Sequence, residues 1–247
     1  MREDEVLSGM VLYAADQGEY GKRLVVLTKE CGKVTMFANN ARKPNNPLVA
    51  VCRIFATGSF TVRRGRDSYT LFSADISEWF SGFEKDIEKF CYASYLCEFM
   101  SYYTHEGEYS KDFLNLLFVA VKAVEKGEVD VELVRRVFEL KTMMLAGEGP
   151  NVFGCVSCAD REGQAFFSVS RGGVLCEACG RLAKDAVRIS PTVAYTLKYI
   201  AQSPLTELFS FSLKSDALEE FGRLAAGFVK RYVDREFKSL EILNGIV

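Results

Sequence analysis

Two cysteine pairs with the same spacing constrain this chain more than any other feature of its sequence. Cys155 and Cys158 form one C-x2-C pair, Cys176 and Cys179 form a second, and 17 residues separate the two pairs. This spacing is typical of a four-cysteine zinc site, because each pair aims two thiolates at one point and four thiolates complete a tetrahedral shell. Four thiolates leave no open position for water or substrate. The sequence therefore predicts one structural Zn²⁺ per chain.

The segment between the two pairs resembles a small zinc finger. Apolar stretches at 166–169 and 174–175 flank the glycines at 172–173, which predicts a hairpin, and a helix is expected to begin near Cys179. Knuckle, hairpin and helix start together describe a treble-clef-type finger. A redox switch is the main alternative, but a thioredoxin-like motif needs a single pair in a βαβ setting. Two disulfides are not expected in a reducing cytosol. The four remaining cysteines have no motif spacing and are interpreted as structural: Cys31, Cys52, Cys91 and Cys97.

The first 80 residues have the pattern of short antiparallel strands. Turn signals rich in Gly, Pro, Asn and Asp separate stretches rich in β-branched and aromatic residues. Six strands are predicted, at 6–15, 22–28, 33–38, 49–56, 59–64 and 68–73. Five or six short strands leave exposed edges in an open sheet, so a small closed barrel is favoured. The pattern fits an OB-like or an SH3-like barrel equally well.

Helical periodicity follows after about Glu78. The predicted helices span 84–103, 111–126, 131–145, a segment beginning at Ser190-Pro191, and 216 to about 243. The first is apolar around most of its circumference, which indicates a buried central helix. The expected fold is therefore an α+β multidomain protein with an N-terminal barrel. A C-terminal helical domain follows, with the zinc finger inserted in it.

Composition and motifs argue against several functions. The chain has 247 residues, 49% hydrophobic and 26% charged, which is ordinary for a soluble protein. It has no apolar run near 20 residues and begins with an acidic segment, so we expect a cytoplasmic protein with no membrane partner. Its only histidine, His105, lies in a polar stretch and is interpreted as a solvated loop residue. Phosphate-binding glycine loops are missing as well, and no enzyme activity is predicted.

The barrel segment carries a local excess of positive charge. Residues 17–70 contain ten Lys and Arg against three acidic residues, a net charge of +7 within a chain of net charge −2. Seven of the ten form three clusters: Lys22 with Arg23, Arg42 with Lys43, and Arg63, Arg64 with Arg66. Strand ends and loops of a small barrel converge, so these clusters are predicted to line one groove and to bind phosphates, although simple solvation is an equally good account of each residue alone.

Aromatic residues near the basic clusters are candidates for stacking on unpaired bases. They are Tyr20, Phe37, Phe60 and Tyr69. For Phe37 and Phe60, filling of the barrel interior is the favoured interpretation.

Several segments together resemble the RecO family of bacterial DNA-repair proteins. The resemblance rests on Gly18-Glu-Tyr-Gly-Lys-Arg23 through Leu27–Lys33, on Ala41-Arg42-Lys43, on Tyr92–Glu98, and on the four cysteines with Gly172-Gly173. It covers almost the whole chain in the family's order. Gly21 departs from the family at a position where an acidic residue is common. Asn40 stands where glycine is usual, and asparagine also tolerates a left-handed backbone.

The resemblance implies an OB-fold at 1–80, a helical domain at 81–150 and 183–247, and a zinc finger at 151–182. It implies a nucleoid-associated recombination mediator that binds single- and double-stranded DNA and anneals strands coated by single-stranded-DNA-binding protein (SSB). With RecR, such a mediator promotes RecA loading at gaps and breaks. The DNA contacts it implies are the seven clustered basic residues, Lys22, Arg23, Arg42, Lys43, Arg63, Arg64 and Arg66. An apolar pocket with a basic rim would be needed for the SSB C-terminal tail, and the helical domain offers four candidates for that rim: Lys214, Arg223, Lys230 and Arg231.

Two other classes of protein remain open on the sequence. One is an enzyme whose barrel and finger only hold nucleic acid. The other is a zinc-stabilised adaptor or transcription factor that binds nucleic acid without annealing activity. Binding that does not depend on base sequence distinguishes the mediator from a transcription factor.

Overall fold

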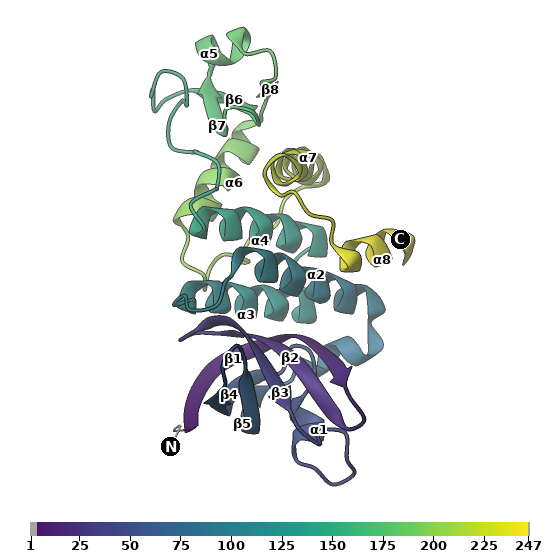
Figure 1. Ribbon diagram of the computed structural model, residues 1–247. Helices are drawn as coiled ribbons and strands as arrows, with labels where there is room; N and C mark the ends of the chain where they lie inside the picture. The colour runs from purple at the N-terminus through teal and green to yellow at the C-terminus, as the bar shows by residue number, and fades with distance from the viewer. Residues whose placement is uncertain (1–3, 247) are drawn as a thin grey trace. The chain divides into compact units, whose positions relative to one another are not determined.

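A computed structural model describes residues 4–246, so residues 1–3 and 247 of the predicted domains lie outside the described part (Figure 1). Contacts divide the chain into two compact units. One comprises Met1–Glu125 with Phe237–Val247, and the other comprises Lys126–Glu236. The three-part domain division expected from the sequence stays a prediction. Of the helices that the structure describes, none has the length and hydrophobicity that a membrane span requires.

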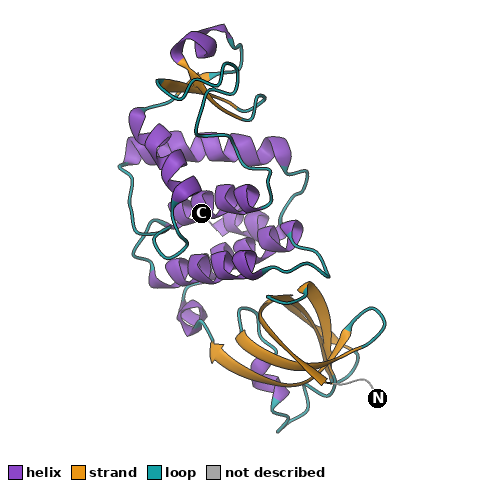
Figure 2. Cartoon of the chain, turned by 90° about the vertical axis from the view of Figure 1, so that its left-hand side faces the viewer, coloured by secondary structure: helices purple, strands orange, loops and turns teal. Residues whose placement is uncertain are grey.

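The first unit begins with a closed five-stranded barrel (Figure 2). Its strands are β1 (Asp4–Gln17), β2 (Gly21–Thr28), β3 (Gly32–Ala38), β4 (Thr57–Arg64) and β5 (Tyr69–Glu78). The spatial order is β1-β2-β3-β5-β4, and antiparallel pairing of β1 with β4 closes the barrel. All the pairs are antiparallel except β3 with β5. This is the OB-fold, one of the two barrels that the sequence pattern allowed.

Alternating side chains explain why these segments form a barrel. In β3 every second residue is buried, starting from Gly32, and the residues between them face outward. Inward residues of all five strands share one core, in which Phe60 and Val62 are fully buried. The barrel therefore has a packed interior, and any ligand surface lies on its outside or at its ends.

The predicted strand at 49–56 is wrong. Leu48–Val51 forms a single helical turn, α1, and β4 begins only at Thr57. Leu48 and Val51 are buried against the barrel core. Residues 48–51 are apolar because they pack against the barrel core. A buried strand and a buried helical turn have the same apolar pattern, so the sequence did not distinguish them.

Helices complete the first unit. They are η1 (Ser81–Lys85), α2 (Ile87–Tyr103), α3 (Lys111–Lys126) and α8 (Lys238–Ile246). The α2 helix starts three residues later than predicted because the Asp86 side chain caps it, accepting a hydrogen bond from the Lys89 N–H at 3.0 Å. As predicted, α2 is largely buried. The α8 helix packs against it, and the Ser239 hydroxyl donates to the Glu98 carboxylate at 2.8 Å (Figure 1).

The second unit combines three packed helices with the cysteine-rich segment. Its elements are α4 (Val131–Leu145), β6 (Gln164–Ser168), β7 (Gly173–Cys176), α5 (Glu177–Leu182), β8 (Val187–Arg188), α6 (Pro191–Gln202) and α7 (Ser215–Tyr232). Ser190 caps α6 as predicted, its hydroxyl accepting from the Val193 N–H at 3.3 Å. The single helix predicted from 216 to about 243 is two helices, since residues 233–237 between α7 and α8 are not helical.

Candidate metal centre and nucleic-acid interface

The four predicted metal ligands converge on one point. The sulfur atoms of Cys155, Cys158, Cys176 and Cys179 all lie within 4.8 Å of one another. Those of Cys158 and Cys176 are 3.8 Å apart. Zn–S bonds of about 2.3 Å place the sulfurs of a tetrahedral site roughly 3.8 Å apart, so the observed spacing fits such an ion. The cluster could therefore hold one metal ion.

Local backbone structure brings the two pairs together. The first pair lies in a tight turn in which the Cys155 N–H donates to the Asp160 carbonyl at 2.7 Å and Ala159 is left-handed, with φ of 62°. The second pair joins the end of β7 to the start of α5. A β-carbon on Gly180 would lie 2.3 Å from the Phe166 ring, so only glycine lets α5 pack this closely against β6.

Electrostatics in the cluster favour a bound cation. Burial alone would raise the pKa of Cys155, but the backbone N–H groups of Cys176, Ser157 and Cys158 bring it down to about 6. Contacts with the neighbouring thiols, that of Cys176 foremost, raise the pKa of Cys179 to about 12. Four thiolates this close repel one another, and a divalent cation is what allows all of them to ionise together.

Basic and aromatic side chains form one patch where the β1–β2 hairpin meets the turn after β3. We call it the hairpin patch: Tyr13, Tyr20, Arg23, Arg42 and Lys43. Arg23 lies over the Tyr13 ring at 5.7 Å, and Lys43 lies over the Tyr20 ring at 5.2 Å. Arg42 pairs with Asp16 at 3.2 Å, and its N–H donates to the Tyr20 carbonyl. The turn is thereby held against the hairpin.

A second patch lies on the β4–β5 hairpin. We call it the β4–β5 patch: Arg63, Arg64, Arg66 and Phe72. Arg63 lies over the exposed Phe72 ring at 4.8 Å and pairs with Asp4 at 2.9 Å. The side chain of Arg66 is 93% exposed. Arg63 thus meets an exposed aromatic residue that the prediction missed, whereas Arg64 faces the buried Tyr69 across β4 and β5. Their shared role as DNA contacts stays a prediction.

Strand register links the two patches. Arg23 faces Phe37 across β2 and β3, Phe37 faces Thr70 across β3 and β5, and Thr70 faces Arg63 across β5 and β4. None of these four is buried, so the row lies on the outside of the barrel. Because the barrel is closed, the row follows its circumference. The predicted single groove thus corresponds to two patches joined by this row.

Lys22 is placed differently from the other six basic residues. It shares a face of β2 with the buried Leu24, and its ammonium group donates to the Cys52 carbonyl at 3.3 Å. This contact ties the start of β2 to the chain that follows α1. Its role as a DNA contact stays a prediction.

The stacking candidates divide by burial. Tyr20 is exposed, whereas Phe60 and Tyr69 are inside the barrel and Phe37 is half-buried. Filling of the barrel interior is confirmed for Phe60. It is wrong for Phe37, which lies on the outward face of β3, and Tyr69 is wrong as a stacking residue because it is buried. Three exposed aromatic residues of the barrel region were missed: Tyr13, Phe72 and Trp79. Alternation could have found Phe72, because it follows the inward-facing Leu71.

His105 lies in the loop between α2 and α3, as its sequence context predicted. Its side chain is 69% exposed, and its Nδ1 is 3.8 Å from the Glu108 carboxylate. Its backbone carbonyl accepts a hydrogen bond from the Lys33 N–H, so this loop lies against the β2–β3 turn. His105 thus lies in a loop that is hydrogen-bonded to the barrel.

The chain contains an OB barrel with exposed basic and aromatic pairs, several helices and a four-cysteine cluster. It therefore belongs to the class of proteins that combine an OB-fold with further domains. The chain belongs to the RecO family. The family model "Recombination protein O N terminal" matches residues 1–80, and "Recombination protein O C terminal" matches residues 84–241.

Curated relatives match over nearly their full length. The DNA repair protein RecO of Alkaliphilus metalliredigens is 29% identical over 96% of this chain and 98% of its own. That of Acetivibrio thermocellus is 27% identical over 96% of this chain and 95% of its own. That of Desulforamulus reducens is 27% identical over 96% and 93%. The similarity thus extends over the segments that form the barrel, the helices and the cysteine-rich region.

Proposed function

We propose that this protein is a recombination mediator in DNA repair. It binds single- and double-stranded DNA on the outside of its barrel, anneals complementary strands coated by SSB, and with RecR promotes the loading of RecA at the nucleoid. In this role it makes and breaks no covalent bond. The barrel at 1–80 holds DNA, the zinc finger at 151–182 is structural, and the helical domain offers the surface for the SSB tail.

The observation that carries the proposal is the set of three basic–aromatic pairs on the barrel. They are Arg23 with Tyr13, Lys43 with Tyr20, and Arg63 with Phe72. A guanidinium or ammonium group neutralises phosphate, while the ring beside it stacks on a base, and neither interaction depends on base identity. Strand annealing needs this kind of binding, because the protein must hold any two complementary sequences. Family membership and the names of the relatives support the same function.

Zinc is the metal that we propose for the cysteine cluster. Four sulfur donors at tetrahedral spacing are the preferred environment of Zn²⁺, and the ion would lock the two C-x2-C turns together. Cys155, Cys158, Cys176 and Cys179 would hold it. Its contribution is folding energy for a segment with a small core of its own.

The test is the annealing of two complementary oligonucleotides, each coated with the cognate SSB and followed by fluorescence quenching without nucleotide. We expect this protein to accelerate annealing of any complementary pair, whatever its sequence. A non-complementary pair is the control. A second assay on end-labelled DNA with Mg²⁺ checks that no strand is cut or joined.

The outcomes separate the alternatives. Acceleration that is independent of sequence supports the mediator. Binding to bare DNA without any acceleration would indicate an adaptor that lacks annealing activity, and binding confined to one sequence would indicate a transcription factor. Cleavage or joining of the labelled strand would indicate an enzyme.

A further inference from the structure

A cavity lined by aromatic rings lies beside the barrel, apart from both basic patches. It has a volume of about 460 Å³ and lies within the first unit. Five aromatic residues line it: Phe55, Trp79, Phe80, Phe83 and Phe90. Arg53 and Glu84 supply polar groups to its lining. The volume falls in the lower part of the range of small-ligand sites, about 300–1,000 Å³.

The rings form a continuous wall. Phe55 meets Phe83 edge-to-face with centroids 5.1 Å apart, and it meets Phe90 in the same way at 5.6 Å. Phe80 stacks on Phe83 at 6.2 Å with an interplanar angle of 16°. Such contacts fix the ring orientations, so the cavity is formed before any ligand enters.

Two of these residues have an unfavourable backbone conformation. Phe55 has φ of 69° and Phe80 has φ of 50°, both in the left-handed region that bulky residues avoid. A bulky residue keeps this conformation only where its surroundings enforce it. Strain of this kind clusters at ligand sites, and here both strained residues line the same cavity.

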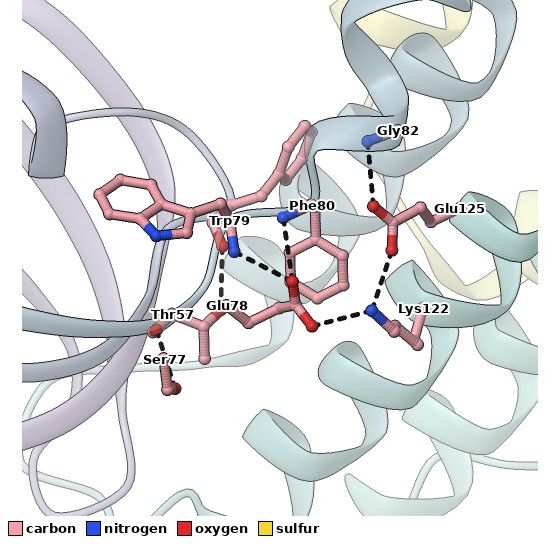
Figure 3. A network of polar contacts seen from close by, with 9 residues as sticks. Thr57, Ser77, Glu78, Trp79, Phe80, Gly82, Lys122 and Glu125 are labelled. Carbon is pink, nitrogen blue, oxygen red and sulfur yellow. Dashed lines mark hydrogen bonds and ion pairs between the residues drawn. The ribbon is translucent and has the colours of Figure 1, made fainter.

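A polar network holds the backbone around Trp79 in place (Figure 3). One Glu78 carboxylate oxygen accepts hydrogen bonds from two backbone N–H groups, that of Trp79 at 3.1 Å and that of Phe80 at 3.4 Å. The other oxygen of Glu78 accepts from the Lys122 ammonium group at 2.8 Å. Lys122 also bonds to Glu125 at 3.0 Å, and the Glu125 carboxylate accepts from the Gly82 N–H at 3.1 Å.

The indole of Trp79 is not part of this network. Figure 3 shows it pointing away from Glu78 and Lys122, and the residue is 43% exposed. A half-exposed tryptophan on an anchored backbone is a rigid stacking surface that loses little conformational freedom when a ligand binds. It is also the only tryptophan of the chain.

We propose that this cavity takes one unpaired nucleobase of a single strand bound along the barrel, with Trp79 stacking on its face. The proposal rests on DNA binding by the barrel, as proposed above. Arg53 and Glu84 give the lining one positive and one negative side chain. Balanced charge suits a neutral, planar base with donors and acceptors on its edge, and it suits an acidic peptide poorly.

The distance to the basic patches fits a bound strand. Trp79 follows Glu78, which faces Thr57 at the start of β4, and Arg64 ends that strand. Seven residue steps along a strand span about 23 Å. A single strand that occupies one OB-fold covers roughly 4–16 nucleotides, so one strand can contact the β4–β5 patch and enter the cavity.

The fluorescence of Trp79 provides a direct test in the full-length protein. Oligo-dT of about 16 nucleotides is titrated in, beside an oligomer of equal length in which every position is abasic, while anisotropy of a labelled strand reports binding. We expect oligo-dT to quench the emission strongly and the abasic strand to leave it nearly unchanged. Quenching that is equal for the two strands, or bound oligo-dT without quenching, overturns the base site while leaving DNA binding by the barrel intact.

Substitution gives a second, independent measurement. Trp79→Ala should weaken single-strand affinity roughly 5- to 150-fold, the loss of one stacked base, while duplex affinity stays the same because its bases are paired. Tyr195→Ala removes a ring that is 69% exposed on α6 and is the matched control, expected to change neither affinity. Wild-type affinity of a folded Trp79→Ala protein overturns the proposal. Wild-type protein that binds no DNA at all contradicts both this site and the proposed function.

Discussion

Arg63, Arg64 and Arg66 are three exposed basic residues close together in the β4–β5 hairpin. Arg66 is almost fully exposed, and Arg63 is half-exposed beside the Phe72 ring. Changing all three to Glu should weaken single-strand binding. It should also reduce the slope of log affinity against log salt by about 2, because each neutralised phosphate of a single strand contributes roughly 0.7. Titrations at several salt concentrations measure both quantities.

Three exposed basic residues outside the barrel provide the matched control for this charge change. They are Lys111, Lys214 and Arg223. Reversing them alters net charge by the same amount, and we expect nearly unchanged affinity for bare DNA, with far-ultraviolet circular dichroism verifying both folds. If the control weakens binding as much as the β4–β5 patch variant does, binding follows total charge and the patch has no special role.

At the scale of secondary-structure elements, the sequence predicted the elements whose form depends on neighbouring residues. It failed to predict the elements whose form depends on packing between distant segments. Four of the barrel strands match their predicted ranges within two residues at each end, because alternation and turn residues are local. The α1 turn was predicted as a strand, since an apolar run does not reveal which conformation buries it. The break between α7 and α8 was also missed. The chain there leaves the helix so that Phe237 can pack on Tyr95, a contact that spans 142 positions and that no local pattern predicts.

The link between β5 and α3 makes a prediction about pH. The hydrogen bond from Lys122 is the main reason why the pKa of Glu78 lies below its ordinary value of 4.5, and the N–H groups of Phe80 and Trp79 lower it further. A lowered pKa means that Glu78 stabilises the fold above pH 4.5 and that this contribution is lost as the pH falls through the folded value. Glu78→Gln should therefore be less stable than wild type at neutral pH and should lose less stability between pH 5 and pH 3.

The fluorescence of Trp79 reports this change, because the backbone N–H of Trp79 donates a hydrogen bond to the Glu78 carboxylate. Urea unfolding followed by tryptophan emission at several pH values measures the difference. Glu106→Gln makes the same chemical change at an exposed carboxyl in the loop between α2 and α3 and should behave as wild type. Parallel stability curves for wild type and Glu78→Gln over this pH range would show that the ion pair contributes nothing.

At the scale of the whole molecule, the two candidate sites differ in how far sequence could predict them. The four cysteines were found in full because their positions are fixed by two short turns and one hairpin. The barrel surface was found only in part, because which side chains meet there depends on register between strands distant in sequence. Arg23 and Arg63 are 40 positions apart and belong to one row only because β3 and β5 pair in parallel between them. The cavity beside Trp79 could not be predicted from the sequence, because the barrel region, η1 and α2 all contribute to its lining.

Metal removal tests whether the cysteine cluster and the barrel act independently. The finger has a core of only a few residues, so we expect it to depend on the metal for its fold, as small metal-binding domains do. The barrel has its own core and should keep its structure. Stripping the ion with a chelator should raise amide hydrogen exchange across residues 155–182 strongly. It should leave exchange in β1–β5 unchanged, and affinity for bare single strands within about twofold.

Substitutions give the same answer without a chelator. Cys158→Ser removes a ligand and should reduce bound zinc from one per chain to well below one, whereas Cys31→Ser removes a thiol outside the cluster and should leave it at one. Wild-type protein purified without chelator that contains well under one zinc per chain would refute the zinc assignment. If zinc is present and its loss abolishes binding of bare DNA, the finger itself contacts DNA or supports the barrel, and its role is more than structural.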